Sequence, residues 1–208
     1  MALIHHTTVK PTKVELLAGW LPTRPWYHGP AAPELVKAGG FRLDDPAGEV
    51  GIEFMVAAEG SGAYLVPLTY RGAPLEGAEH ALVGTAEHGV LGTRWIYDGC
   101  HDPVLTGELL ALLEGRAEAQ AQSITDTPDR EVERSYTGQG PVPGLGTPVD
   151  TDESTEFAVP DSGLVLRLRR VLTAGSTAPD DALGRITGAW QQPDGTRARA
   201  LFATLQAL

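Results

Sequence analysis

The alternation of apolar residues with smaller or polar ones is the feature that most constrains the fold of this chain. Every second residue in 50–56 is apolar, and glycines at positions 60 and 62 separate that segment from the extended-looking Tyr64–Tyr70. A period of two is typical of a β-strand, and two such segments joined by a short turn predict a β-hairpin. The fold must therefore accommodate paired strands that bury an apolar face.

Further segments carry strand patterns along the chain. The ranges 3–9 and 90–97 each predict a strand, and 164–169 alternates leucine with valine or arginine. Two more strands are expected at 186–191 and 197–205, and a Gln-Pro-Asp-Gly sequence predicts the turn between them. The total is about seven or eight strands, with no internal repeat.

Two helices are expected beside these strands. Thr12 and Glu15 have the spacing of a capping box, and Pro22 limits the helix that they begin. Asp102 can cap a second helix, which has proline in its first turn and ends near Gly115. The predicted fold is α+β, with a mainly antiparallel β-sheet packed on one or two helices.

The charge changes along the chain and divides it into three parts. Residues 1–116 hold the first hairpin and both helices. Residues 117–162 contain ten acidic and two basic side chains and few large apolar groups, which predicts a long loop or linker. Residues 163–208 contain six arginines and three aspartates, and their strands are expected to complete the same domain.

The six arginines of this last part are Arg167, Arg169, Arg170, Arg185, Arg197 and Arg199. They could dock the acidic segment, bind an anionic ligand, contact a partner protein or face solvent.

The net charge and the cysteine content exclude several classes of protein. The formal charge is −11 at pH 7, from 16 basic and 27 acidic side chains, which argues against a general binder of nucleic acid or anionic membranes. No signal peptide and no span of about 20 apolar residues is apparent, so a cytoplasmic location is expected. Cys100 is the single cysteine, which makes an intrachain disulfide impossible and suggests a small buried residue.

Two stretches of the sequence carry a family resemblance. Residues 12–27 read TKVELLAGWLPTRPWY, and residues 64–113 run from YLVPLTY through YDGCHDP into a leucine-rich helix. Both resemble the N-terminal cap region of bacterial maltokinases, enzymes that phosphorylate maltose. The resemblance extends over roughly residues 1–115. It implies a cystatin-like topology, in which an antiparallel sheet curls against a helix. It also implies a stand-alone cap-like protein, because the remaining residues do not resemble the kinase body.

The motifs of phosphoryl transfer and glycoside chemistry are absent from the sequence. It contains neither GxxxxGK[ST] nor the kinase GxGxxG pattern, and no catalytic-loop aspartate with a downstream asparagine is recognisable. No paired carboxylates occur in a barrel context. The histidines, among them His80 and His88, match no zinc-binding spacing. No catalytic residue, cofactor or metal is therefore expected, although a small enzyme of glucan metabolism that uses His101 is retained as a further hypothesis.

The segment Tyr97–Pro103 is the most concentrated polar cluster in the sequence. It places two carboxylates, the Cys100 thiol and the His101 imidazole within seven residues. A cysteine–histidine nucleophile pair needs the base within hydrogen-bond reach and a third group that orients it, which adjacent turn residues rarely achieve. A structural role at a helix start is the favoured interpretation, in which Asp102 accepts backbone N–H bonds and His101 orders the turn.

Aromatic side chains offer a second type of candidate site. The segment 20–27 could form a platform for sugar rings, or its tryptophans could close the core, and the core interpretation is favoured. In the maltokinase cap, the matching aromatic segment belongs to the scaffold. The residues proposed to bind a ligand are Trp20, Trp26, Tyr27, Trp95, His101 and Trp190.

Two functions from different classes follow from the sequence. The leading hypothesis is a non-catalytic cap-like protein that binds or regulates a sugar kinase or glucan-pathway enzyme in α-glucan, maltose or trehalose metabolism. The alternative is a protein that binds a sugar or sugar phosphate in a tryptophan-lined pocket. A homodimer formed through an exposed sheet edge is compatible with either function.

Overall fold

The computed structural model describes residues 9–60, 62–122, 124 and 127–208. Within these residues, eleven strands form one antiparallel path in the order β1-β5-β6-β4-β3-β2-β11-β12-β10-β9-β8, and a twelfth, β7, pairs with β11. The strands are β1 (Val9–Lys10), β2 (Val36–Asp44), β3 (Gly51–Glu59), β4 (Gly62–Arg71), β5 (Leu82–His88), β6 (Gly92–Asp98), β7 (Glu133–Tyr136), β8 (Val149–Asp150), β9 (Ser154–Val159), β10 (Leu164–Arg169), β11 (Gly184–Gln191) and β12 (Arg197–Ala207).

In the described residues, two α-helices, α1 (Lys13–Trp20) and α2 (Pro103–Glu114), accompany the sheet. The short 3₁₀ turn η1 (Leu21–Thr23) follows α1, η2 (Glu79–Ala81) precedes β5, and η3 (Gly99–His101) precedes α2. The predicted α+β class with a mainly antiparallel sheet is confirmed, with more strands than the seven or eight expected. No helix of the described chain has the length and hydropathy needed to cross a bilayer.

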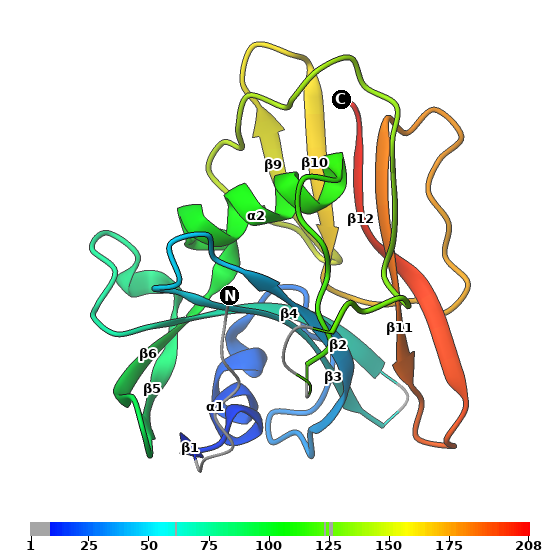
Figure 1. Ribbon diagram of the computed structural model, residues 1–208. Helices are drawn as coiled ribbons and strands as arrows, with labels where there is room; N and C mark the ends of the chain where they lie inside the picture. Colours follow the sequence, from blue (N-terminus) through cyan, green and yellow to red (C-terminus); the bar gives the residue numbers. More distant parts are fainter. Residues whose placement is uncertain (1–8, 61, 123, 125–126) are drawn as a thin grey trace.

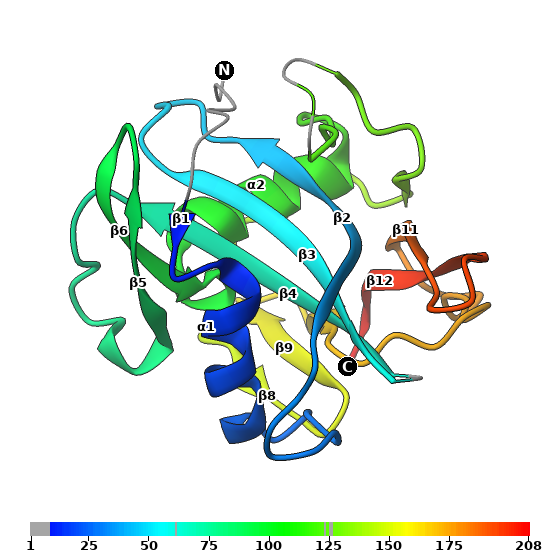
Figure 2. The ribbon, with the colours of Figure 1, turned by 90° about the horizontal axis from the view of Figure 1, so that it is seen from below.

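The two helices lie on opposite faces of the N-terminal strands (Figures 1 and 2). Helix α1 packs against β3 and β4 in a core that contains Leu17, Met55 and Val66. Helix α2 buries its leucines in a second core, together with Phe54 of β3 and Phe202 of β12. The strands β9 to β12 rise beside α2 (Figure 1), so this helix lies between the two halves of a bent sheet.

The local signals of the sequence form as expected. Thr12 and Glu15 make the reciprocal capping box of α1. Helix α2 begins at the Asp102 cap and ends at Gly115, which takes the left-handed conformation with φ 81°. The β3–β4 hairpin and the strands predicted near 90–97, 164–169, 186–191 and 197–205 are present. Of the strand predicted at 3–9, residues 3–8 lie outside the described residues, and Val9 begins β1.

The described part of the acidic segment 117–162 contains three strands where the sequence predicted a loop or linker. Strand β9 buries Phe157 and Val159, and Gln120 pairs with Arg42 of β2. The prediction relied on the acidic composition and the small number of large apolar residues, and such a composition does not reveal single apolar residues at alternate strand positions. Among the residues that the structure describes, four ion pairs also join this segment to the C-terminal strands: Arg167–Glu156, Arg169–Glu153, Arg197–Glu131 and Arg199–Glu133. The hypothesis that the arginines dock the acidic segment is confirmed for these four.

Residues 163–208 join the sheet of residues 1–116 at two places. Trp190 of β11 pairs with Gly39 of β2. The segment after β10 lies along the start of β4, where the Leu65 N–H donates to the carbonyl of Arg170 and the Leu172 N–H donates to that of Ala63. The C-terminal strands therefore extend the same sheet rather than forming a separate layer.

A glycine at position 40 is required where β2 approaches its neighbours. Gly40 has φ +120°, and a Cβ built there would lie 1.9 Å from the carbonyl oxygen of Phe54. Gly40→Ala is therefore expected to lower the free energy of unfolding by at least about 2 kcal/mol, as measured by urea denaturation.

Gly107 provides the matched control for this substitution. It is exposed within α2, and a Cβ there meets no atom within 4 Å. Gly107→Ala should stabilise the protein by about 0.5–1 kcal/mol, because alanine has the higher helix propensity. Equal stability of the Gly40→Ala variant and the unaltered protein would contradict this account of β2.

Candidate functional site

The turn between β6 and α2 is built around a buried ion pair. Nη2 of Arg170 donates to both carboxylate oxygens of Asp98, at 2.8 and 2.6 Å, and Nε donates to Oγ1 of Thr155 at 2.7 Å. The arginine side chain is fully buried, and its Cζ lies 4.9 Å from the ring centroid of Trp26. One side chain thus contacts β6, β9 and the segment after α1.

The charge of Arg170 is maintained by its carboxylate partner. Burial alone would lower the pKa of this guanidinium, but the neighbouring Asp98 raises it above its ordinary value. The remaining nitrogen, Nη1, has no hydrogen-bond partner among the described residues. Asp98 also accepts the backbone N–H of Cys100 at 3.1 Å, which orders the start of the turn.

The second carboxylate of the turn is also held by an arginine. Arg71 of β4 donates from Nε and Nη2 to the two oxygens of Asp102, at 2.6 and 2.7 Å. Asp102 accepts the Val104 N–H at 3.0 Å and so caps α2, as the sequence predicted. Bidentate arginine pairs fix the orientation of a carboxylate. Asp98 and Asp102 are thus committed to structural contacts.

Cys100 is unsuited to act as a nucleophile in this turn. It is 1% exposed, and burial raises the pKa of its thiol well above the usual range. A protonated, inaccessible thiol behaves as a small apolar residue. The core interpretation of Cys100 agrees with its burial.

His101 contacts a second histidine from another turn. Its Nδ1 lies 3.0 Å from Nε2 of His80 on η2, and the two rings meet edge to face with centroids 4.6 Å apart. Burial lowers the pKa of His101 below 6.5, and this effect outweighs the opposing charges of Asp98 and Asp150. Both His80 and Arg170 lower the pKa further, so His101 is neutral at neutral pH.

Glu53 forms a buried polar network that the sequence analysis did not identify. Its carboxylate accepts from Lys13 at 2.5 Å, from the Tyr70 hydroxyl at 2.6 Å and from Gln122 at 3.0 Å, and Lys37 lies 3.3 Å away. Burial would raise the pKa of Glu53, but the two lysines and the hydrogen bonds lower it to about 2. A carboxylate so firmly ionised is a structural anchor and not a proton donor near neutral pH. The sequence signal that could have identified Glu53 is its position between apolar residues in the strand pattern of β3.

The aromatic residues near α1 form a closed cluster. Trp20 and Trp26 meet edge to face at 5.9 Å, and Tyr27 lies 5.0 Å from Tyr64, measured between ring centroids. Trp20, Trp26 and Tyr27 are 7%, 0% and 9% exposed. These faces are not available to stack on a sugar ring, which agrees with the core interpretation of the segment.

The other two tryptophans lie elsewhere in the molecule. Trp95 packs beside Tyr97 in a small separate cluster, and Trp190 belongs to the core around α2. The structure therefore does not bring the four tryptophans into one pocket. Trp190, itself 3% exposed, borders a groove.

That groove has a volume of about 550 Å³ and lies where three turns meet. Its walls come from the β3–β4 turn, from residues 172–174 and from the β11–β12 turn. Thr173, Gln192 and Asp194 supply polar groups, and Leu172 and Pro193 supply apolar surface. A smaller groove of about 300 Å³ lies over the β8–β9 turn, β9 and β10 and is lined by charged and hydroxyl side chains. Both volumes are compatible with small ligands.

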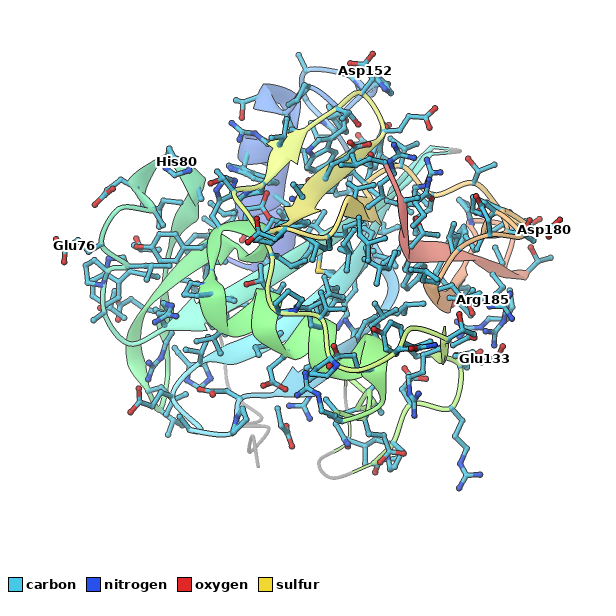
Figure 3. The ribbon with its side chains drawn as sticks, turned by 90° about the horizontal axis from the view of Figure 1, so that it is seen from above. Glu76, His80, Glu133, Asp152, Asp180 and Arg185 are labelled. Carbon is cyan, nitrogen blue, oxygen red and sulfur yellow. The ribbon has the colours of Figure 1, made fainter. Side chains whose placement is uncertain are left out.

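Polar side chains, many of them charged, project from several sides of the molecule. Figure 3 shows Glu76 and His80 at one end, Asp180, Arg185 and Glu133 at the other, and Asp152 on a third side. In the part of the chain that the structure describes, no three His, Cys, Asp or Glu side chains are arranged to hold a metal ion.

Comparison with known proteins identifies part of the chain. The family model of the maltokinase N-terminal cap domain matches residues 20–102. The match begins at the last residue of α1, includes strands β2 to β6 and ends at the Asp102 cap of α2. It contains Asp98 and His101 but not Arg170 or Trp190. The resemblance to the maltokinase cap is confirmed over this segment. No curated protein matches the chain.

The titration of His101 tests the geometry of its turn. Because its pKa is lowered on folding, the neutral ring contributes stability above about pH 6.5, and this contribution is lost as the pH falls through the folded pKa. Histidine NMR resonances should show a lower midpoint for His101 in the folded protein than in urea. A folded midpoint at or above the unfolded one would contradict the burial of this ring beside His80 and Arg170.

Proposed function

We propose that the chain is a non-catalytic cap-like protein that binds or regulates an enzyme of α-glucan, maltose or trehalose metabolism. A sugar kinase or another glucan-pathway enzyme is the proposed partner. The match of residues 20–102 to the maltokinase N-terminal cap domain carries this proposal, because that family is named for a maltose kinase and its cap. A cap domain is associated with a kinase body, which favours a protein partner.

The chemistry of the YDGCHDP turn supports a scaffold role. Asp98 and Asp102 are each bound by an arginine, and Cys100 is buried as a thiol. Nucleophilic or acid–base chemistry needs groups free to exchange protons with a substrate. The groups of this turn instead fix the junction of β6 and α2.

An exposed apolar turn supports contact with a protein partner. Val90 and Leu91 are 63% and 45% exposed at the turn of the β5–β6 hairpin, which lies at one end of the sheet (Figure 1). Nδ1 of His88 accepts the backbone N–H groups of both residues, and Arg94 donates to the carbonyl of Leu91. The turn is thus ordered before binding, which reduces the entropic cost of docking.

Several finer features belong to this proposal as predictions. They are the cystatin-like topology, the division of the chain at residues 116 and 162, the bacterial cytoplasm as the location, and the homodimer. Within the described residues, the path ends in β8, which has two residues, so a homodimer formed by pairing at that edge would bury few backbone groups.

Capture of a partner tests the proposed function. The purified full chain, used as bait in an extract of its native cells, should retain a sugar kinase or glucan-pathway enzyme through a salt wash. The purified enzyme should bind the chain directly in biolayer interferometry. Val90→Ser with Leu91→Ser should weaken that binding at least about tenfold, because the two changes remove apolar surface that the partner would bury.

Val36→Ser with Val149→Ser is the matched control, since these residues are similarly exposed on other strands. The control should bind like the unaltered chain. Recovery of no enzyme of this class, or failure of the recovered enzyme to bind the purified chain, would refute the partner proposal.

The 550 Å³ groove favours a second candidate function, the binding of a sugar or sugar phosphate. Trp190 lies at its edge, and the carboxylate of Asp194 and the amide of Gln192 are suited to hydroxyl groups. The groove spans the boundary of the family match, since its lining residues of β3, β4 and their turn lie within the match, whereas those of residues 172–174 and of the β11–β12 turn lie outside it. A ligand there would contact both parts of the chain.

Tryptophan fluorescence tests the second candidate. Maltose, trehalose or a sugar phosphate should cause a saturable shift that Trp190→Phe abolishes, because this tryptophan borders the groove. Trp95→Phe removes a tryptophan from a different cluster and should retain the shift. A shift that persists in the Trp190→Phe variant, or no shift with any of these ligands, would exclude sugar binding in this groove.

A further inference from the structure

Two histidines from distant parts of the sequence meet near the protein surface. His80 lies on η2 and is exposed, and His101 lies on η3 and is half-buried. The distance of 3.0 Å joins Nε2 of the first ring to Nδ1 of the second. Figure 3 shows His80 at the end of the molecule opposite Asp180 and Arg185. Neither histidine lines the two grooves described above.

The spacing of the two nitrogens suits a shared metal ion. Imidazole nitrogens bind Zn²⁺ at about 2.0–2.1 Å, so two of them on one ion lie roughly 3.0–3.4 Å apart. The observed separation of 3.0 Å falls at the lower end of this range. The ion would replace the hydrogen bond that now joins the rings, after a small rotation of the exposed His80 side chain.

Two carboxylates, Asp98 and Asp150, act on His101 with negative charge. Because Asp98 is itself paired with Arg170, Asp150 supplies the negative charge that is not already balanced. Metal binding requires an unprotonated imidazole nitrogen. The 3.0 Å contact between the two rings requires that at least one of the facing nitrogens accepts a hydrogen bond and so carries no proton.

We propose that His80 and His101 bind a divalent first-row transition cation of the Zn²⁺ and Cu²⁺ class through Nε2 and Nδ1. Imidazole is a preferred ligand of both ions. Because the described residues offer no third protein ligand, water fills the remaining positions and the ion is exchangeable. The site is independent of the proposed partner and of the groove.

Copper electron paramagnetic resonance provides a direct test. The protein is prepared without an affinity tag and with His5→Ala and His6→Ala, which remove a second adjacent histidine pair. One equivalent of Cu²⁺ should bind saturably with hyperfine structure from two nitrogens, and Zn²⁺ should displace it. His80→Ala should weaken the affinity at least about tenfold and remove one nitrogen from the spectrum, because it deletes one of two ligands.

Two further variants complete the test. His28→Ala is the matched control, because His28 contacts the carbonyl of Asp152 on another side of the molecule. It should bind Cu²⁺ like the parent. His101→Ala should lose the second nitrogen, with circular dichroism confirming that the variant is folded. Absence of one-equivalent binding in the parent, or binding that His80→Ala leaves unchanged, would overturn the proposal and leave the pair as a hydrogen bond alone.

Discussion

The buried pair of Arg170 and Asp98 is the interaction on which the rest of the structure depends. Removing two charges from water costs several kcal/mol per ion, and the cost is offset only when geometry and further hydrogen bonds are favourable. Here Thr155 and the face of Trp26 complete the surroundings of the guanidinium. The arginine follows β10, its carboxylate partner ends β6, and the family match includes only the carboxylate. The pair therefore ties the C-terminal strands to the cap-like segment.

The contacts around this pair explain why the chain forms one continuous sheet. The backbone of residues 170–172 pairs with the start of β4. Gly39 of β2 pairs with Trp190 of β11. Helix α2 fills the space between the two halves with leucines, and Asp102 fixes its first turn through Arg71. Two arginine–carboxylate pairs thus hold the same short turn from both ends. Such a turn is suited to support a binding surface, in keeping with the proposed function.

The sequence predicted the features that depend on neighbouring residues. The capping box at Thr12, the Asp102 cap and the β3–β4 hairpin each follow from residues close together in the chain. Charge composition indicated that the C-terminal arginines could dock the acidic segment, but the individual contacts between distant residues were missed, because no local pattern shows that Arg170 meets Asp98 or that His80 meets His101. The predicted ligand site was missed for the same reason. The sequence identified six candidate ligand residues, but the core in which each one lies depends on which strands pair. The strands of segment 117–162 form against partners elsewhere, so its composition alone could not predict them.

A double-mutant cycle on the buried pair tests this account most directly. Arg170→Met leaves a buried carboxylate without its cation, and Asp98→Asn leaves a buried cation without its carboxylate. Each should lower the free energy of unfolding in urea by about 3–5 kcal/mol. The double variant should lose much less than the sum of the two, because neither charge is then left unpaired. Additive losses, or single variants as stable as the unaltered chain, would contradict the claim that this pair joins the two parts of the protein.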